Sequence, residues 1–185
     1  MQDPQTAVAE IIDFWFAAGM EKRWFIHDPA FDVEVRTRLA EWYECAATGG
    51  LDDWLNTAAG CVALCVLLDQ VPRNLFRGQG RAFATDAAAR TVAVYALEHD
   101  LDRTLPQAQR LFLYLPFEHS ESMADQDASV RLFGQLDENP QWIDYANRHR
   151  DVIARFGRFP HRNASLDRAC TAAEKAFLAT PGSSF

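Results

Sequence analysis

The sequence lacks several features that define whole classes of protein. It has no stretch of the roughly 18 to 20 uninterrupted apolar residues that a membrane-spanning helix requires, and its longest apolar run, Cys61 to Leu68, has the length of a core helix. The start of the chain lacks the positive residues and apolar stretch of a secretory signal. We therefore predict a soluble, cytoplasmic protein with no membrane partner.

Cysteine is scarce, with four residues in a chain of 185, and their spacing argues against disulfides and against a cysteine-bound metal. Cys61 and Cys65 lie four apart in an apolar run, where free cysteine behaves as a small hydrophobe. Cys45 and Cys170 have no Cys or His at ligand spacing. Disulfide scaffolds also belong to smaller secreted chains. We expect four reduced structural thiols.

Positive charge is in short supply as well. The formal net charge is −8, and strongly acidic proteins are poor general binders of nucleic acid, so we predict no nucleic-acid partner. The charge is uneven, however. Residues 1–60 carry four basic against eleven acidic side chains, whereas residues 148–162 carry five arginines against one aspartate. This local reversal marks the C-terminal third as a candidate binding region.

Sustained alternation of apolar and polar residues is missing, and so are Asn-Gly and Asp-Gly hairpin turns. Helical signals dominate instead, including the Asp28-Pro29 start and the Thr171/Glu174 capping-box pattern. We predict an all-α single domain over residues 1–185, with about eight helices in antiparallel pairs. These helices are expected at about 4–18, 29–48, 55–68, 85–99, 107–114, 120–133, 140–156 and 171–178.

The common catalytic signatures are absent too. The chain has no P-loop, dinucleotide-binding fingerprint, nucleophile elbow or CxxC motif. The sequence therefore identifies no catalytic residue and no cofactor, and it leaves open whether the protein is an enzyme.

The first of three polar clusters follows the most apolar helix. Asp69 is expected at the C-terminal end of that helix, where the helix dipole disfavours a carboxylate. A buried, unpaired carboxylate costs several kcal/mol or becomes protonated, so Asp69 should have a cationic partner. Arg73, Arg77 and an arginine from the third cluster are the candidates. The alternative interpretation is a structural ion pair that locks the helix end.

The second cluster surrounds Pro116, which lacks a backbone donor and is expected to kink or end its helix. Glu118, His119 and Glu121 would then lie on a chain reversal and could converge. Imidazole and carboxylate suit several divalent metals, so a metal site at this turn is one hypothesis. No HExxH-type pair supports it. The preferred interpretation therefore has no metal.

The third cluster begins at His149. This residue shares one helical face with Trp142, Tyr145, Val152 and Phe156, so its side chain is expected to point inward. An inward histidine is either a satisfied core residue or part of a site, and the sequence does not distinguish the two.

Arg155, Arg158 and Arg162 follow, interleaved with Phe156 and Phe159. Guanidinium groups match carboxylate and phosphate, which favours a small anionic ligand. Arginine beside aromatic residues also grips RNA bases. The acidic background and the absence of a longer basic stripe argue against RNA.

These clusters lie within motifs that resemble a bacterial family known only as a domain of unknown function, number nine-two-four, in the tetratricopeptide-like helical superfamily. The resemblance spans nearly the whole chain and implies an all-helical stack with a superhelical twist, but no reaction. The motifs that carry it are Ile12 to Phe16, Leu67 to Asn74, Arg81 to Asp86, Leu115 to Glu121 and Arg155 to Asn163.

From the sequence we predict a helical protein that binds a small anionic molecule in an Arg/His/Glu-lined pocket. In an enzymatic version, His119 or His161 would transfer protons. The first alternative is a protein- or peptide-interaction module in which the polar cluster is purely structural. The second is the divalent-metal turn at Glu118, His119 and Glu121. The oligomeric state is not predicted.

The candidate site residues are Asp69, Arg73, Asn74, Arg77, Glu118, His119, Glu121, His149, Arg155, Arg158, His161, Arg162 and Asn163.

Overall fold

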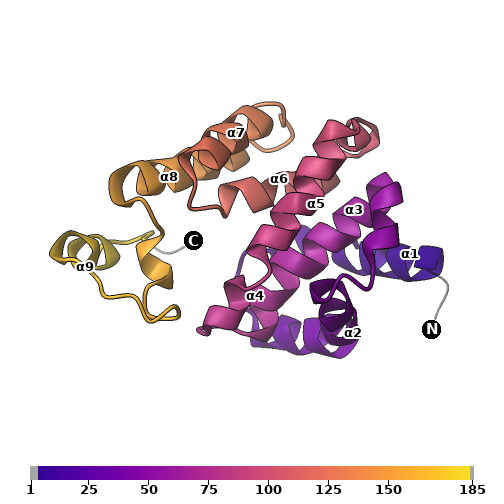
Figure 1. Cartoon of the computed structure of the whole chain (residues 1–185), viewed down its shortest axis with the longest axis horizontal. Helices are drawn as coiled ribbons and strands as arrows, with labels where there is room; N and C mark the ends of the chain where they lie inside the picture. Colours follow the sequence, from indigo (N-terminus) through magenta and orange to yellow (C-terminus); the bar gives the residue numbers. More distant parts are fainter. Residues whose placement is uncertain (1–3, 184–185) are drawn as a thin grey trace.

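The computed structural model describes residues 4–183, which form α-helices and short 3₁₀ turns with no strand among them (Figure 1). The all-α prediction is confirmed. No helix of the described part is long and apolar enough to cross a bilayer. The helices are α1 (Pro4–Trp15), α2 (Pro29–Ala47), α3 (Ala58–Cys65), α4 (Val71–Leu75), α5 (Asp86–Glu98), α6 (Gln107–Glu118), α7 (Met123–Phe133), α8 (Gln141–Phe156) and α9 (Ala172–Leu178).

Side-chain caps start two of these helices where the sequence predicts them. The Asp28 carboxylate accepts a hydrogen bond of 2.9 Å from the Ala30 amide at the start of α2. At α9, Thr171 and Glu174 each accept a hydrogen bond from the other's backbone amide, at 3.2 and 2.7 Å. These bonds satisfy donors that the first helical turn leaves without a partner.

The most apolar segment forms the centre of the core. Every residue from Gly60 to Pro72 is buried, and α3 packs against α1, α5 and α6. Gly60 is required by the close approach of the preceding 3₁₀ turn (Asp52–Asn56), since a Cβ there would lie 2.0 Å from the Trp54 carbonyl oxygen.

Successive helices pack on one another in the second half of the chain: α5 on α6, α6 on α7, and α7 on α8 (Figure 1). Short connections between them produce antiparallel neighbours. One hydrophobic cluster extends from α1 to α8, and a smaller one around Val152, Ile153 and Phe159 connects α8 to the C-terminal segment. The tetratricopeptide-like twist and the single-domain organisation stay predictions.

The sequence predicts that the apolar helix ends at Asp69, but in the structure the chain stays helical beyond this residue. Residues Val66–Gln70 form a π-helical turn, and the chain continues directly into α4, with Pro72 in its first turn, where a missing amide donor costs little. Residues 71–75, which lie outside the helices expected from the sequence, therefore form a helix. A π turn carries an extra residue and is frequent at functional sites. Here it contains Asp69, which is buried like its neighbours in the turn.

Pro116 also behaves differently from the expectation, because α6 runs through it to Glu118. Residues 111–118 are all buried, and tertiary packing offsets the lost backbone hydrogen bond. Glu118 consequently ends α6, and His119 and Glu121 lie in the short connection between α6 and α7.

Candidate functional site

The centre of the polar cluster is a carboxylate–imidazole pair. Asp69, in the π turn, lies 2.8 and 2.9 Å through its two oxygens from Nδ1 of His119, which follows α6. Gln70 donates to the same carboxylate at 2.6 Å, and Arg73 Nη1 lies 3.3 Å from it. Asp69 is 1% exposed and therefore needs a cationic partner, as predicted. Among the three candidates, that partner is Arg73.

The electrostatics of this pair follow from its burial. Desolvation raises the pKa of Asp69, but the charge of Arg73 and the hydrogen bonds from His119 and Gln70 outweigh it, and the pKa lies well below its usual range. For His119, desolvation outweighs the attraction of Asp69 and lowers the pKa. His119 is therefore neutral at pH 7. Because the ionised carboxylate can only accept hydrogen bonds, Nδ1 carries the imidazole proton and Nε2 keeps a lone pair.

A second carboxylate joins two arginines above this pair. Asp86, the first residue of α5, lies 3.0 and 3.2 Å from the two terminal nitrogens of Arg73 and 3.1 Å from Nη1 of Arg162. The Arg162 guanidinium stacks on Phe83 and Phe159, with its central carbon 4.6 Å from each ring centre. Its side chain is 7% exposed. Burial and the charge of Arg73 lower the pKa of Arg162 to about 10.

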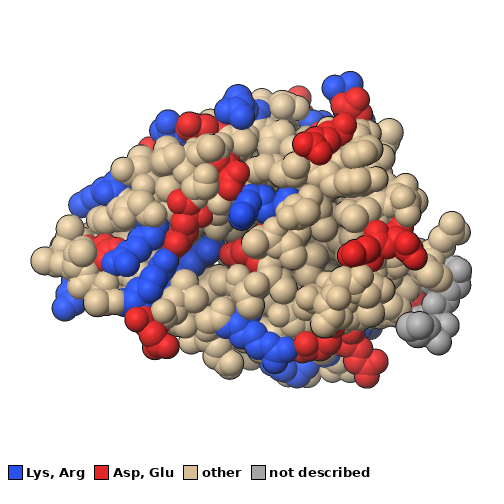
Figure 2. Space-filling model, in the orientation of Figure 1, with Lys and Arg blue, Asp and Glu red and all other residues tan. Residues whose placement is uncertain are grey.

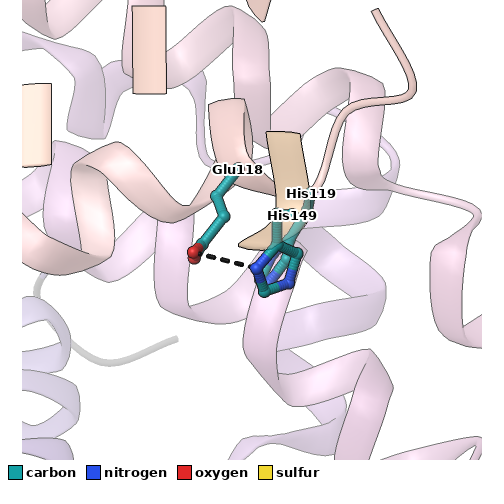
Figure 3. Close-up of side chains that lie close together, drawn as sticks. All are labelled: Glu118, His119 and His149. Carbon is teal, nitrogen blue, oxygen red and sulfur yellow. Dashed lines mark ion pairs between the residues drawn. The ribbon is translucent and has the colours of Figure 1, made fainter. Parts of the chain in front are cut away.

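Glu118 and His149 form a buried pair beside His119 (Figure 3). Nδ1 of His149 lies 3.1 Å from Oε1 of Glu118 and 2.9 Å from the carbonyl oxygen of Tyr145. His149 is buried on the inner face of α8, as predicted, whereas Tyr145 is 49% exposed although it was expected on that face. One ligand atom each of Glu118, His119 and His149 lies within 4.8 Å of the others.

His161 lies close to these groups. Burial, followed by the positive charge of Arg162, lowers the pKa of His161 to about 3, so its imidazole is neutral at pH 7. Its ring centre is 5.6 Å from that of Phe159.

An open groove of about 530 Å³ runs along this cluster. Figure 2 shows acidic and basic side chains interleaved where the C-terminal segment faces α4 and α5. The charged and imidazole side chains that line the groove are Asp86, Arg90, His119, Glu121 and Arg162.

The structure thus brings together residues from all three sequence clusters. Those that gather around the His119 imidazole and the adjoining groove are Asp69, Arg73, Glu118, His119, Glu121, His149, His161 and Arg162.

Glu121 lies in the groove wall but is directed to other partners. Its carboxylate accepts hydrogen bonds from Arg168 at 2.8 and 3.0 Å and from the Phe159 amide at 2.8 Å. Burial raises the pKa of Glu121, and Arg168 more than reverses this, so the pKa lies below its usual value. Glu121 is not in the group of potential metal ligands that contains Glu118 and His119.

Five further candidates lie outside this cluster. Arg77 and Asn74 both bind Asp32 of α2, with contacts of 2.7 and 2.8 Å. Arg158 forms a two-pronged ion pair with Glu174 at 2.6 and 2.9 Å. The other two are Arg155, whose guanidinium lies over Phe156 and Phe177, and Asn163, which contacts the Cys170 sulfur.

Two site residues escaped the sequence-based selection. Asp86 balances Arg73 and Arg162, and the need of buried arginines for a carboxylate was the signal that could have found it. Arg168 forms an ion pair with Glu121 but lies beyond the arginine cluster, and no feature of the sequence indicated this contact.

The chain belongs to a family of bacterial proteins of unknown function, DUF924, whose model matches residues 11–182. This confirms the family resemblance of its motifs. The chain is also similar to the solved structure of ATU0120, a protein of unknown function from Agrobacterium tumefaciens. The two are 41% identical with a TM-score of 0.91, over 96% of this chain and 99% of that one. No curated protein matches the chain.

Proposed function

We propose that the groove beside α5 binds a small anionic ligand and that Arg162 is the cation that holds it. The observation that carries this proposal is the Nε atom of Arg162. It is buried, and no described atom accepts a hydrogen bond from it. A buried donor left without an acceptor costs about 1 to 3 kcal/mol. A carboxylate or phosphate oxygen would supply that acceptor.

The neighbourhood of Arg162 supports an anion rather than a neutral ligand. Arg162 shares the Asp86 carboxylate with Arg73, which also pairs with Asp69, so Arg162 has no carboxylate of its own among the described residues. Arg77 and Arg158, by contrast, each have a two-pronged carboxylate partner of their own. A fork-shaped guanidinium with an unfilled position matches a planar oxyanion.

The alternative is a peptide-binding module, and one observation favours it. A second hollow, of about 320 Å³, is lined by Phe16, Trp24 and Trp142 among others, and Phe25 nearby is 58% exposed. Aromatic anchors of this kind are common at interfaces. The Arg162 groove is preferred because it contains an unsatisfied buried charged group.

A thermal-shift titration with inorganic phosphate, citrate and short dicarboxylates tests the anion proposal. At a ligand concentration of 100 times Kd, binding adds about 2.7 kcal/mol, which raises the Tm by about 5 to 10 °C for a chain of this size. The shift should be lost in Arg162→Gln and kept in the control Arg77→Lys, whose ion pair with Asp32 lies on α2. A Tm that no anion moves, or a shift that Arg162→Gln retains, would refute the proposal.

A further inference from the structure

The end of α6 and the middle of α8 bring a carboxylate and two imidazoles together (Figure 3). Glu118 is 2% and His149 5% exposed, and the His119 side chain is 14% exposed. Exposed acidic and imidazole groups meet by chance on many surfaces. Burying such groups together costs free energy unless hydrogen bonds, ion pairs or a bound metal compensate for the lost solvation. We propose that Glu118, His119 and His149 form a binding site for a divalent transition-metal cation.

The first argument concerns the hydrogen bonds of Glu118. His149 Nδ1 has at most one proton, yet it lies 2.9 Å from the Tyr145 carbonyl oxygen and 3.1 Å from Glu118 Oε1. The proton is directed to the carbonyl, and Oε1 is buried without a hydrogen-bond donor among the described atoms. An ionised oxygen in that position needs a cation or a donor. A metal ion between Glu118 and the two imidazoles would satisfy it.

The second argument concerns the orientation of His119. Asp69 binds its Nδ1–H group through both oxygens, which fixes the ring and directs the lone pair to Nε2. A carboxylate that holds the far nitrogen of an imidazole is the usual companion of a metal-binding histidine, and it increases the basicity of the ligating nitrogen. Gln70 and Arg73 hold the Asp69 carboxylate in turn. The supporting shell of a metal site is thus already assembled.

The composition of the group indicates the class of metal. Two imidazoles and one carboxylate suit zinc, iron, cobalt, nickel or manganese rather than calcium or magnesium, which prefer oxygen ligands. Three protein ligands leave at least one coordination position open. Because His119 also lines the groove, the metal site would adjoin the place where we expect the anion. The metal site itself does not require that anion.

This set differs from the turn predicted from sequence, since His149 takes the place of Glu121. The carboxylate of Glu121 instead accepts hydrogen bonds from Arg168 and from the Phe159 amide. A purely structural role for the group would require Glu118 and His149 to be satisfied by one another. The position of Tyr145 argues against that, because its carbonyl oxygen competes for the same proton.

Equilibrium dialysis of the metal-free, EDTA-treated protein against Co²⁺, followed by displacement with Zn²⁺, tests the site. We expect one bound Co²⁺ per chain, an absorption spectrum without thiolate-to-cobalt charge transfer, and a loss of affinity of about tenfold or more in Glu118→Gln and in His149→Gln. The matched control is His99→Gln, because His99 is exposed at the end of α5 and should not contribute. Absence of Co²⁺ binding, or unchanged affinity in both site variants, would overturn the proposal.

Either variant could fail to fold, which circular dichroism would show. In that case, proton NMR of the Co²⁺ form of the wild-type protein tests whether the two histidines bind the metal. Two histidine ligands should give paramagnetically shifted imidazole N–H signals, including that of the Asp69-bound proton of His119, and their absence overturns the site. The phosphate titration uses EDTA-treated protein, so the anion and metal proposals can fail separately.

Discussion

Asp69 and His119 are 50 positions apart in the chain, and both oxygens of the aspartate lie within 2.9 Å of Nδ1 of the histidine. This contact connects the most apolar segment of the protein to the end of α6. It also places an ionised carboxylate, 1% exposed, at the centre of the fold. The contact requires the π turn at one end and a helix that continues through Pro116 at the other.

Asp69→Asn should destabilise the protein strongly. The substitution removes the charge that Arg73 and His119 face, and breaking a buried ion pair from one side costs about 3 to 5 kcal/mol. Urea denaturation at pH 7 would measure the free energy of unfolding. The control Asp13→Asn changes an exposed aspartate of α1 and should stay within about 0.5 kcal/mol of wild type. Equal effects of the two substitutions would contradict the central role of the pair.

Asp86→Asn should separate stability from anion binding. Without ligand, the Tm should fall, because Arg73 and Arg162 lose a shared charged acceptor. Phosphate should bind more tightly than to wild type, because a competing negative charge has been removed from Arg162. A thermal-shift titration gives both quantities. Weaker phosphate binding in this variant would count against the anion groove.

Gly60→Ala should destabilise the protein although alanine favours helices by about 1 kcal/mol. The added Cβ would lie 2.0 Å from the Trp54 carbonyl oxygen and 2.8 Å from Thr57 Oγ1, so backbone would have to move, at a cost of about 1 to 3 kcal/mol or more. Gly134→Ala is the comparison, since its nearest atom, the Val130 carbonyl oxygen, is 3.3 Å away. Urea unfolding should show a smaller loss there.

The Arg158–Glu174 pair should make stability depend on acid pH. The hydrogen bond from Arg158, with help from Thr171, lowers the pKa of Glu174 well below its ordinary 4.5. A carboxyl group whose pKa falls on folding stabilises the native state above pH 4.5, and this contribution is lost as the pH drops further. Wild type should therefore be more stable than Glu174→Gln at pH 7, and the difference should shrink below pH 4.5. A constant difference between pH 7 and pH 3 would contradict this.

The candidate site was only partly predictable from sequence. The need of Asp69 for a cation follows from its place in an apolar run, but the choice between Arg73 and Arg77 depended on whether the chain continued as a helix. It does, and the i,i+4 spacing selects Arg73. The metal hypothesis from sequence grouped Glu118 and His119 with Glu121, whereas the structure groups them with His149. Because α6 continues to Glu118, this carboxylate meets His149 of α8.

The sequence by itself determined the helical class, two of the helix starts, the family and the apolar centre, because periodicity, capping residues and apolar runs act over a few neighbouring residues. Tertiary structure alone decided which charged groups meet. Asp86 joins Arg162 across 76 positions, and Glu121 joins Arg168 across 47. Unlike the i,i+4 pair of Asp69 and Arg73, these two pairs depend on the packing of distant segments, and no local pattern in the chain records them.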